Sequence, residues 1–247
     1  MNARFPFSLA LAAIALLLVG GAVGWAIQSS RSAKDSGAID DAEFNKRVHA
    51  YIVDHPEVLV EAAENLKSQG GKDQLADVID AIEKPFPGAV LGNPNGTLTL
   101  VEFTDFACTY CRSSMADVEA VIAANPDLKV VIRELPIIAP TSGDAARWGL
   151  AAAEQGKYPA FHKAMFAAGR TDLASIESAA RAAGLDLDRA RKFIQDPRVS
   201  AELEANIGFA RKLGIDGTPA WVIGEELIVG AIGREGLAKA VAAARGK

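Results

Sequence analysis

The chain has 247 residues, of which 50% are hydrophobic, and it carries a formal net charge of −5 at pH 7. This composition supplies enough apolar side chains for a packed core and argues against a disordered chain. The net charge is negative and the sequence has no basic stripe, so it does not predict a basic surface of the kind that binds nucleic acid. We therefore expect one good-sized folded domain with additional segments, and no nucleic-acid partner.

The N-terminal stretch from Phe5 to Ile27 is almost continuously apolar, and the charged groups that precede it are Arg4 and the amino terminus. It is long enough to span a bilayer and longer than the usual apolar part of a cleaved signal. Two alternatives therefore stay open for residues 1–27: an uncleaved signal-anchor and a cleaved signal peptide. Either one exports the rest of the chain, and the signal-anchor would tether it to a membrane.

Residues 28–39 are polar and rich in serine, which is typical of a linker. Residues 40–84 then carry three apolar stripes at helical spacing, and Ser68-Gln-Gly-Gly71 is expected to end the second helix. Helices this short are not stable alone, so their apolar faces must pack against something. They either pack on the main domain and on each other, or associate with further copies into a homo-oligomer.

The two cysteines of the chain form a C-x-x-C pair, Cys108 and Cys111, where a strand pattern changes to a helix pattern. Leu98 to Phe106 is an apolar run typical of a buried strand, and apolar residues recur at helical spacing after Cys111. Cys108 is therefore expected at a helix N-terminus, where free N–H groups and the helix dipole favour a negative charge. A thiolate is the reactive form of cysteine, so this pair is the main candidate for chemistry.

Three other kinds of site compete with a redox-active dithiol at this pair. A structural disulfide would add little, because the loop that it closes is very short. A zinc site needs two more ligands, and no second C-x-x-C or closely spaced histidine pair stands beside this one. A copper(I) site needs only two soft thiolates and stays open. We favour the redox dithiol, with no metal and no cofactor, because the two sulfurs themselves carry the electrons.

The first half of the main domain, residues 86–247, follows a strand–helix–strand order. A strand over Leu98–Phe103, a helix over Cys108–Ala124 and a strand over Lys129–Leu135 predict two parallel strands with a right-handed crossover.

The second half is rich in alanine and helical from about 142 to 213, and then ends in two short strands and a helix. Candidate helices of this insertion run over about 143–155, 158–168, 173–183, 186–195 and 198–213. The strands Ala220–Gly224 and Leu227–Gly230 must be antiparallel, because the turn between them is very short. The sequence thus predicts an α/β fold: a mixed βαβ…ββα sheet with an inserted helical subdomain, preceded by a helical segment.

This arrangement, with a C-x-x-C opening the first helix, resembles the thioredoxin fold, and the helical insertion resembles the DsbA-like thiol:disulfide oxidoreductases. Gly217-Thr218-Pro219-Ala-Trp221 is similar to the family loop whose proline is cis and faces the dithiol. Glu134-Leu-Pro-Ile-Ile-Ala-Pro140 also looks like this branch, and Glu102 stands where its members carry a buried glutamate. The resemblance covers roughly residues 86–247, while Tyr51 to Val60 looks like the N-terminal segment of longer, sometimes oligomeric members.

The resemblance implies a role for each residue of the C-x-x-C segment. Cys108 would be the attacking nucleophile, and Cys111, one helical turn further and less exposed, the resolving thiol. Thr109 and Tyr110, between the cysteines, would tune the dithiol and contact the substrate.

Three residues outside this segment complete the expected site. A cis bond before Pro219 would turn the Thr218 backbone toward Cys108 and offer strand-like hydrogen bonds to a substrate chain. An ordinary trans proline is the alternative. A buried Glu102 could carry protons to and from Cys111, whereas a Glu102 carboxylate that reaches solvent could not.

The sequence therefore predicts an enzyme: a thiol–disulfide oxidoreductase of the bacterial cell envelope or periplasm, acting on exported proteins with a membrane redox partner. It is either an oxidase that donates disulfides or an isomerase or reductase that is kept reduced. Self-association through residues 40–84 would favour isomerisation. A copper-binding or redox-sensing module that uses the same cysteine pair without turnover is the alternative from a different class.

Overall fold

The computed structural model describes residues 20–26 and 41–246, and the side chains of 63–72 are not among the described parts. Residues 20–26 are helical. The rest of the predicted signal-anchor or signal peptide, and the whole predicted linker 28–39, lie outside the described residues. No helix within the described ranges combines the length and the apolar character needed to cross a bilayer.

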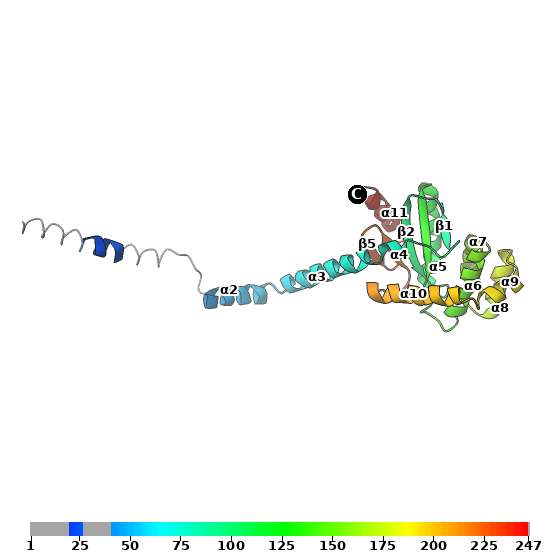
Figure 1. Cartoon of the computed structure of the whole chain (residues 1–247), viewed down its shortest axis with the longest axis horizontal. Coiled ribbons are helices and arrows are strands. Elements are labelled where there is room, and N and C mark those ends of the chain that lie inside the picture. Colours follow the sequence, from blue (N-terminus) through cyan, green and yellow to red (C-terminus); the bar gives the residue numbers. More distant parts are fainter. Residues whose placement is uncertain (1–19, 27–40, 247) are drawn as a thin grey trace, which may run out of the picture. The chain divides into compact units, whose positions relative to one another are not determined.

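The chain divides into two compact units, Met1–Ala63 and Glu64–Lys247. In the first unit lie α2 (Asp41–Asp54) and the beginning of α3 (Glu57–Ala76) (Figure 1). No residue of α2 is buried, and large apolar side chains of both helices are exposed. These side chains are Phe44, Val48, Tyr51, Val53, Leu59 and Val60. Self-association through residues 40–84 stays a prediction.

Helix α3 corrects one expectation from the sequence. It continues through Ser68-Gln-Gly-Gly71, where we expected it to end, and reaches Ala76. Glycine inside a helix costs about 1 kcal/mol relative to alanine, which weakens a helix without forbidding it. Leu75, near the end of α3, is buried in a core cluster together with Val78 and Ile82, and this packing offsets the weak propensity.

The second unit contains a five-stranded mixed sheet in the order β1-β3-β2-β4-β5. Strands β2 and β3 are parallel and joined by α5 (Thr109–Ala124), and the other neighbouring strands are antiparallel. The strands are β1 (Val90–Gly92), β2 (Leu98–Thr104), β3 (Leu128–Glu134), β4 (Ala220–Ile223) and β5 (Glu226–Val229). This confirms the predicted fold class and adds the edge strand β1.

The inserted helical subdomain lies between β3 and β4, and its helices pack on one another beside the sheet (Figure 1). Its helices are α6 (Ser142–Glu154), α7 (Tyr158–Ala168), α8 (Leu173–Ala182), α9 (Leu187–Phe193) and α10 (Pro197–Leu213). Asp172, Asp186 and Asp196 cap the N-termini of α8, α9 and α10 by accepting backbone N–H groups. Local capping chemistry thus sets these helix boundaries close to the predicted ones.

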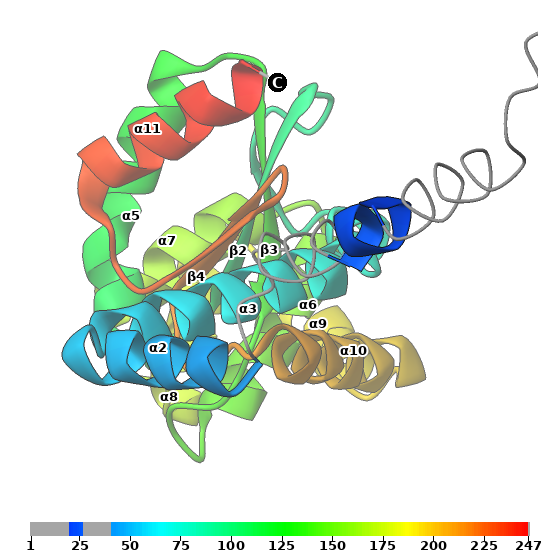
Figure 2. The same ribbon diagram turned by 90° about the vertical axis from the view of Figure 1, so that its left-hand side faces the viewer.

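The two faces of the sheet carry separate cores, because side chains alternate along each strand. Leu100, Val130 and Ile132 belong to the core shared with α5, α6, α7 and α11 (Gly233–Arg245). Figure 2 shows α5 and α11 side by side against the sheet. Val101 and Val131 belong to the second core, with α4 (Ile79–Ile82) and α10. The alternation places Glu102 on the first face, under α5.

Candidate active site

Cys108 is the N-cap residue of α5, as the sequence predicts. Its Sγ accepts a hydrogen bond from the backbone N–H of Cys111 at 3.4 Å. The loop before it is held by the N–H of Cys108, which donates to the Asp105 carbonyl. Both cysteines are free thiols, and Cys111, at 1% exposure, is the more deeply buried of the two. The Cys108 sulfur therefore faces the free N–H groups of the first turn of α5.

The loop before β4 brings a second segment against Cys108. The Cys108 Sγ–H donates to the backbone carbonyl of Thr218 at 3.1 Å, across more than a hundred residues of sequence. The Thr218–Pro219 peptide bond is cis, as the resemblance implies. Thr218 and Pro219 are themselves buried, whereas Thr109 and Tyr110 point outward, with Tyr110 66% exposed. Thr218 and Cys111 therefore both contact Cys108, and Tyr110 lies on the outer surface.

Glu102 lies in β2, next to Trp221 of β4 and Ile132 of β3, and is only 2% exposed. Burial raises the pKa of Glu102 from 4.5 to about 8. Burial, and then the nearby Glu102 carboxylate, also raises the pKa of the Cys111 thiol well above its usual range. A solvent-exposed Glu102 does not fit this structure. The two groups are close enough for the protonation of one to affect the other.

Asp105 is a site residue that the sequence reasoning missed. Its buried carboxylate accepts the N–H of Ala107 through Oδ1, and the N–H groups of Ile137 and Ile138 through Oδ2, at 2.8–2.9 Å. One side chain thus joins the loop that carries Cys108 to the loop that follows β3. Ile137 and Ile138 are 43% and 49% exposed, which places apolar surface beside the dithiol loop.

Glu134, at the end of β3, is a second buried carboxyl group on the face of the sheet that carries Glu102. Its Oε1 accepts the Tyr158 hydroxyl at 2.6 Å, and its Oε2 has no hydrogen-bond partner among the described residues. Gly149 of α6 packs so closely that an added Cβ would lie 2.8 Å from Oε1. Burial raises the pKa of Glu134 well above its ordinary value. The resemblance pointed to the segment around Glu134 without giving it a role.

His162 of α7 lies in an aromatic cluster, with ring centroids 5.8 Å from Phe106 and 4.8 Å from Phe166. Burial lowers the pKa of His162 from 6.5 to about 3, so the ring is neutral at pH 7. No cluster of three or more His, Cys, Asp or Glu side chains that could hold a metal occurs in the described ranges. A copper(I) site needs only the two thiols, so the copper alternative stays untested.

Two protein-family comparisons match different parts of the chain. The DSBA-like thioredoxin domain matches residues 99–242, which include the dithiol, the helical insertion and the cis-proline loop. The N-terminal domain of copper resistance protein ScsC matches residues 40–70, the region of α2 and α3.

Solved structures show the same fold. A thioredoxin-like oxidoreductase from Silicibacter pomeroyi is 40% identical and covers 64% of this chain and 92% of its own, with a TM-score of 0.62. A linker-deletion mutant of Proteus mirabilis ScsC is 28% identical, over 86% and 99% of the two chains, with a TM-score of 0.70. The thiol-disulfide exchange protein alpha-DsbA2 from Wolbachia pipientis is 27% identical, over 72% and 97%, with a TM-score of 0.65.

Curated relatives are much longer proteins. A Na(+)/H(+) antiporter NhaA of Salinispora tropica is 28% identical over 179 residues, which are 71% of this chain and 27% of the antiporter. The chain thus spans about a quarter of the length of the curated relatives that it matches first. The DSBA-like match itself extends over more than half of the chain and contains the whole site. The chain belongs to the DsbA-like family of thioredoxin-fold proteins.

Proposed function

We propose that this protein is a thiol:disulfide oxidoreductase that exchanges disulfides with exported proteins in the bacterial cell envelope, with Cys108 as nucleophile and Cys111 as resolving thiol. The observation that carries the proposal is the position of the Cys108 sulfur. It lies at the N-terminus of α5 and donates to the Thr218 carbonyl, so the nucleophile stands beside the backbone group that would bind a client chain. The apolar stretch Phe5–Ile27 supports export, and we propose that it also tethers the protein to the membrane.

Reduction of a client disulfide then proceeds in two exchanges. The Cys108 thiolate attacks one client sulfur, the client S–S bond breaks, and a mixed disulfide forms while the other client sulfur leaves as a thiolate. The Cys111 thiolate next attacks Cys108 Sγ, which closes the Cys108–Cys111 disulfide and releases the second client thiolate. The client gains two electrons, and the dithiol loses them. Donation of a disulfide to a reduced client is the same sequence in reverse.

Glu102 supplies the proton transfer that the second exchange requires. Cys111 must lose its proton before it can attack, and burial makes this loss unfavourable. Glu102, with its pKa raised to about 8, is buried nearby and can accept the proton and later return it. We assign Glu102 the role of general acid and base for Cys111.

Client binding uses the surface around Cys108. An extended client segment can form a strand-like hydrogen bond with the Thr218 backbone, because the cis-proline loop holds that backbone beside the sulfur. Thr109 lies on the same outer turn, and Tyr110, Ile137 and Ile138 offer exposed apolar surface for unfolded clients. No bound cofactor takes part, because the two sulfurs carry both electrons.

Self-association of the N-terminal helices would decide whether the protein acts as an isomerase or as an oxidase. The exposed apolar side chains of α2 and α3 support self-association, and several dithiols around one client would favour isomerisation over net oxidation. An isomerase must be kept reduced, so we propose a membrane redox partner that supplies electrons to the Cys108–Cys111 disulfide.

The test is reactivation of a model protein with scrambled disulfides. The full chain should restore its activity at catalytic concentrations. Cys108→Ser should lose this activity completely, and Cys111→Ser should accumulate mixed disulfides that are visible on non-reducing gels. If the scrambled client is not reactivated but a reduced client is rapidly oxidised, the protein is a disulfide donor. Wild-type behaviour of both cysteine variants would contradict the proposed mechanism.

A second candidate function uses the same sulfurs to bind copper(I). It is favoured by the match of residues 40–70 to a domain of a copper resistance protein and by the preference of copper(I) for thiolates. Copper(I) stoichiometry of the reduced protein, with and without Cys108→Ser, separates this candidate from catalysis. Tight binding of one copper(I) that depends on Cys108, without reactivation or oxidation of any client, would establish it.

A further inference from the structure

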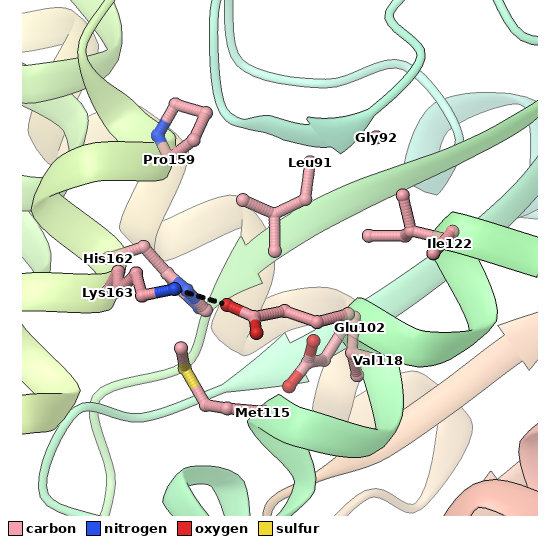
Figure 3. A pocket seen from close by; sticks show the side chains of 11 residues that line it. Leu91, Gly92, Glu102, Met115, Val118, Ile122, Pro159, His162 and Lys163 are labelled. Atoms are coloured by element: carbon pink, nitrogen blue, oxygen red, sulfur yellow. Dashed lines mark hydrogen bonds and ion pairs between the residues drawn. The ribbon is translucent and has the colours of Figure 1, made fainter. Parts of the chain in front are cut away.

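A cavity of about 320 Å³ opens between α5, α7 and the β1–β2 side of the sheet (Figure 3). Its wall is mostly apolar, and Figure 3 shows Leu91, Met115, Val118 and Ile122 around it. Neither cysteine lines this cavity, so it is distinct from the dithiol surface. Its volume lies at the lower end of the range of about 300–1,000 Å³ found for small-molecule sites.

The polar groups of the cavity are arranged in two levels. At the rim, Lys163 and Glu119 form an ion pair of 3.1 Å, and both side chains are largely exposed. Inside, Glu102 and His162 line the cavity while being almost completely buried, at 2% and 4% exposure. The Nε2 of His162 has no hydrogen-bond partner within the described part of the chain.

This arrangement contains no uncompensated charge at neutral pH. The rim charges neutralise one another, and burial holds the pKa of Glu102 at about 8 and that of His162 at about 3. A charged ligand would therefore lose its hydration without gaining an opposite charge, which is costly. A neutral hydroxyl, in contrast, can both donate to and accept from a protonated carboxyl group.

We propose that this cavity binds a small, neutral and mostly apolar molecule, of the size of a substituted aromatic ring, whose single hydroxyl group meets Glu102. The volume supports this class of ligand, because an apolar cavity of about 150 Å³ is already large enough for benzene. The apolar wall holds the ring, and the inner carboxyl group distinguishes a hydroxylated ring from a plain one. Lys163 and Glu119 stand at the entrance.

The site has a consequence for catalysis that rests on the proposed function. Glu102 is the group to which we assign proton transfer for Cys111, and a ligand hydrogen-bonded to it would compete with that transfer. Occupancy of the cavity should therefore slow the resolution of mixed disulfides, while the first attack by Cys108 continues. Binding itself requires neither cysteine.

Methionine methyl groups provide the probe for a direct test. The chain has three methionines; Met115 lines the cavity, while Met165 is fully buried elsewhere in α7. We would titrate full-length protein carrying ¹³C-methyl methionine with p-cresol, toluene, benzoate and benzylamine. We expect a saturable shift of the Met115 signal with p-cresol and at least fivefold weaker binding of toluene. The two charged rings should give no saturable shift, and Met165 should change least.

Two variants sharpen the test. Ala123 lines the cavity and Ala124 does not, although both are exposed residues near the end of α5. Ala123→Phe should weaken p-cresol binding at least tenfold, and the matched control Ala124→Phe should leave it unchanged. Glu102→Leu should remove the preference for p-cresol over toluene.

The outcomes separate this inference from the proposed function. Absence of saturation, equal binding in Ala123→Phe, or equal affinity for p-cresol and toluene in the wild type would overturn the site. Loss of client reactivation together with intact p-cresol binding would overturn only the proposed function. Normal reactivation without p-cresol binding would overturn only the cavity. Cys108→Ser should bind p-cresol as the wild type does.

Discussion

Arg133 of β3 and Glu102 of β2 carry ionisable side chains that are buried on opposite faces of the sheet. Arg133 pairs in register with Phe103, and Glu102 pairs with Ile132, so the two positions differ by one step along the strands. Each is 2% exposed. Their surroundings nevertheless differ in almost every respect.

Arg133 is completely satisfied by partners. Its Nε donates to the Ile82 carbonyl, and its Nη atoms donate to Glu202, Asn206 and the carbonyls of Ala81 and Lys84. All five guanidinium donors are therefore used: two bind carbonyls of α4, those of Ala81 and Ile82, and one binds the Lys84 carbonyl just beyond the helix. This residue fastens α4 and α10 to β3.

Glu102 has the opposite environment. It borders a cavity, it forms no ion pair within the described residues, and burial raises its pKa to about 8. A buried charge with every partner in place supports the fold, whereas a buried acid without an opposite charge is ready to change its protonation state. The comparison predicts that Arg133 contributes to stability and Glu102 to chemistry.

The largest effect should come from Arg133→Met. Removing the guanidinium leaves Glu202 and three backbone carbonyls without their donor, which should cost about 3–5 kcal/mol of unfolding free energy. Urea unfolding measures this loss. The rate of client exchange per folded molecule, and its pH profile, should stay as in the wild type. A changed pH profile would show that Arg133 also takes part in the chemistry.

Glu102→Gln should stabilise the protein at high pH, in contrast to the destabilising Arg133→Met. Because the pKa of Glu102 is raised from 4.5 to about 8, its stabilising contribution is complete below pH 4.5 and is lost as the pH rises through 8. Glutamine does not ionise, so the variant should be more stable than the wild type at pH 9 by about 2–4 kcal/mol, with little difference at pH 4. Urea unfolding at both pH values checks this.

The same variant should be a poorer catalyst. Resolution of the mixed disulfide by Cys111 should slow about tenfold near pH 7, below the ~10²–10⁴-fold typical of acid–base groups, because water can partly replace the carboxyl group. Stopped-flow thiol exchange measures this step. Glu134→Gln is the matched control: it also removes a buried acid with a raised pKa, but it should leave the pH profile of exchange unchanged. Equal effects of both variants on exchange would contradict the special role of Glu102.

The smallest effect should come from His162→Phe. Burial lowers the pKa of His162 from 6.5 to about 3, so its contribution is complete above pH 6.5 and is lost as the pH falls toward 3. Phenylalanine fits the aromatic cluster and cannot be protonated. Between pH 7 and pH 4, the free energy of unfolding of the variant should therefore fall by about 1–2 kcal/mol less than that of the wild type. Chemical unfolding at the two pH values tests this, and parallel loss in both proteins would contradict it.

The sequence predicted most of this fold because its elements carry local signals. Strand β2 is a largely apolar run, the helices α8, α9 and α10 begin at aspartate caps, and glycines follow α7 and α10. Strand β1 was missed because three residues are too few to show alternation. The end expected at Ser68-Gln-Gly-Gly71 was wrong because burial of Leu75 outweighs glycine propensity.

The site was only partly predictable, for a physical reason. The position of Cys108 at a helix start and the burial of Glu102 follow from the sequence around each residue. The partners of Asp105 lie at Ile137 and Ile138, and that of Glu134 is Tyr158, so no spacing in the sequence reveals them. The cavity depends on how α5 and α7 pack over the sheet, and a sequence period cannot show empty volume.

The hydrogen bonds of Asp105 have a mechanical consequence. The Asp105 carboxylate accepts hydrogen bonds from Ala107 and also from Ile137 and Ile138. This one side chain therefore joins the loop that carries Cys108 to the loop that follows β3. A displacement of Ile137 or Ile138 would therefore strain the same carboxylate that holds the segment before Cys108. The positions of the two loops are therefore coupled through this one side chain.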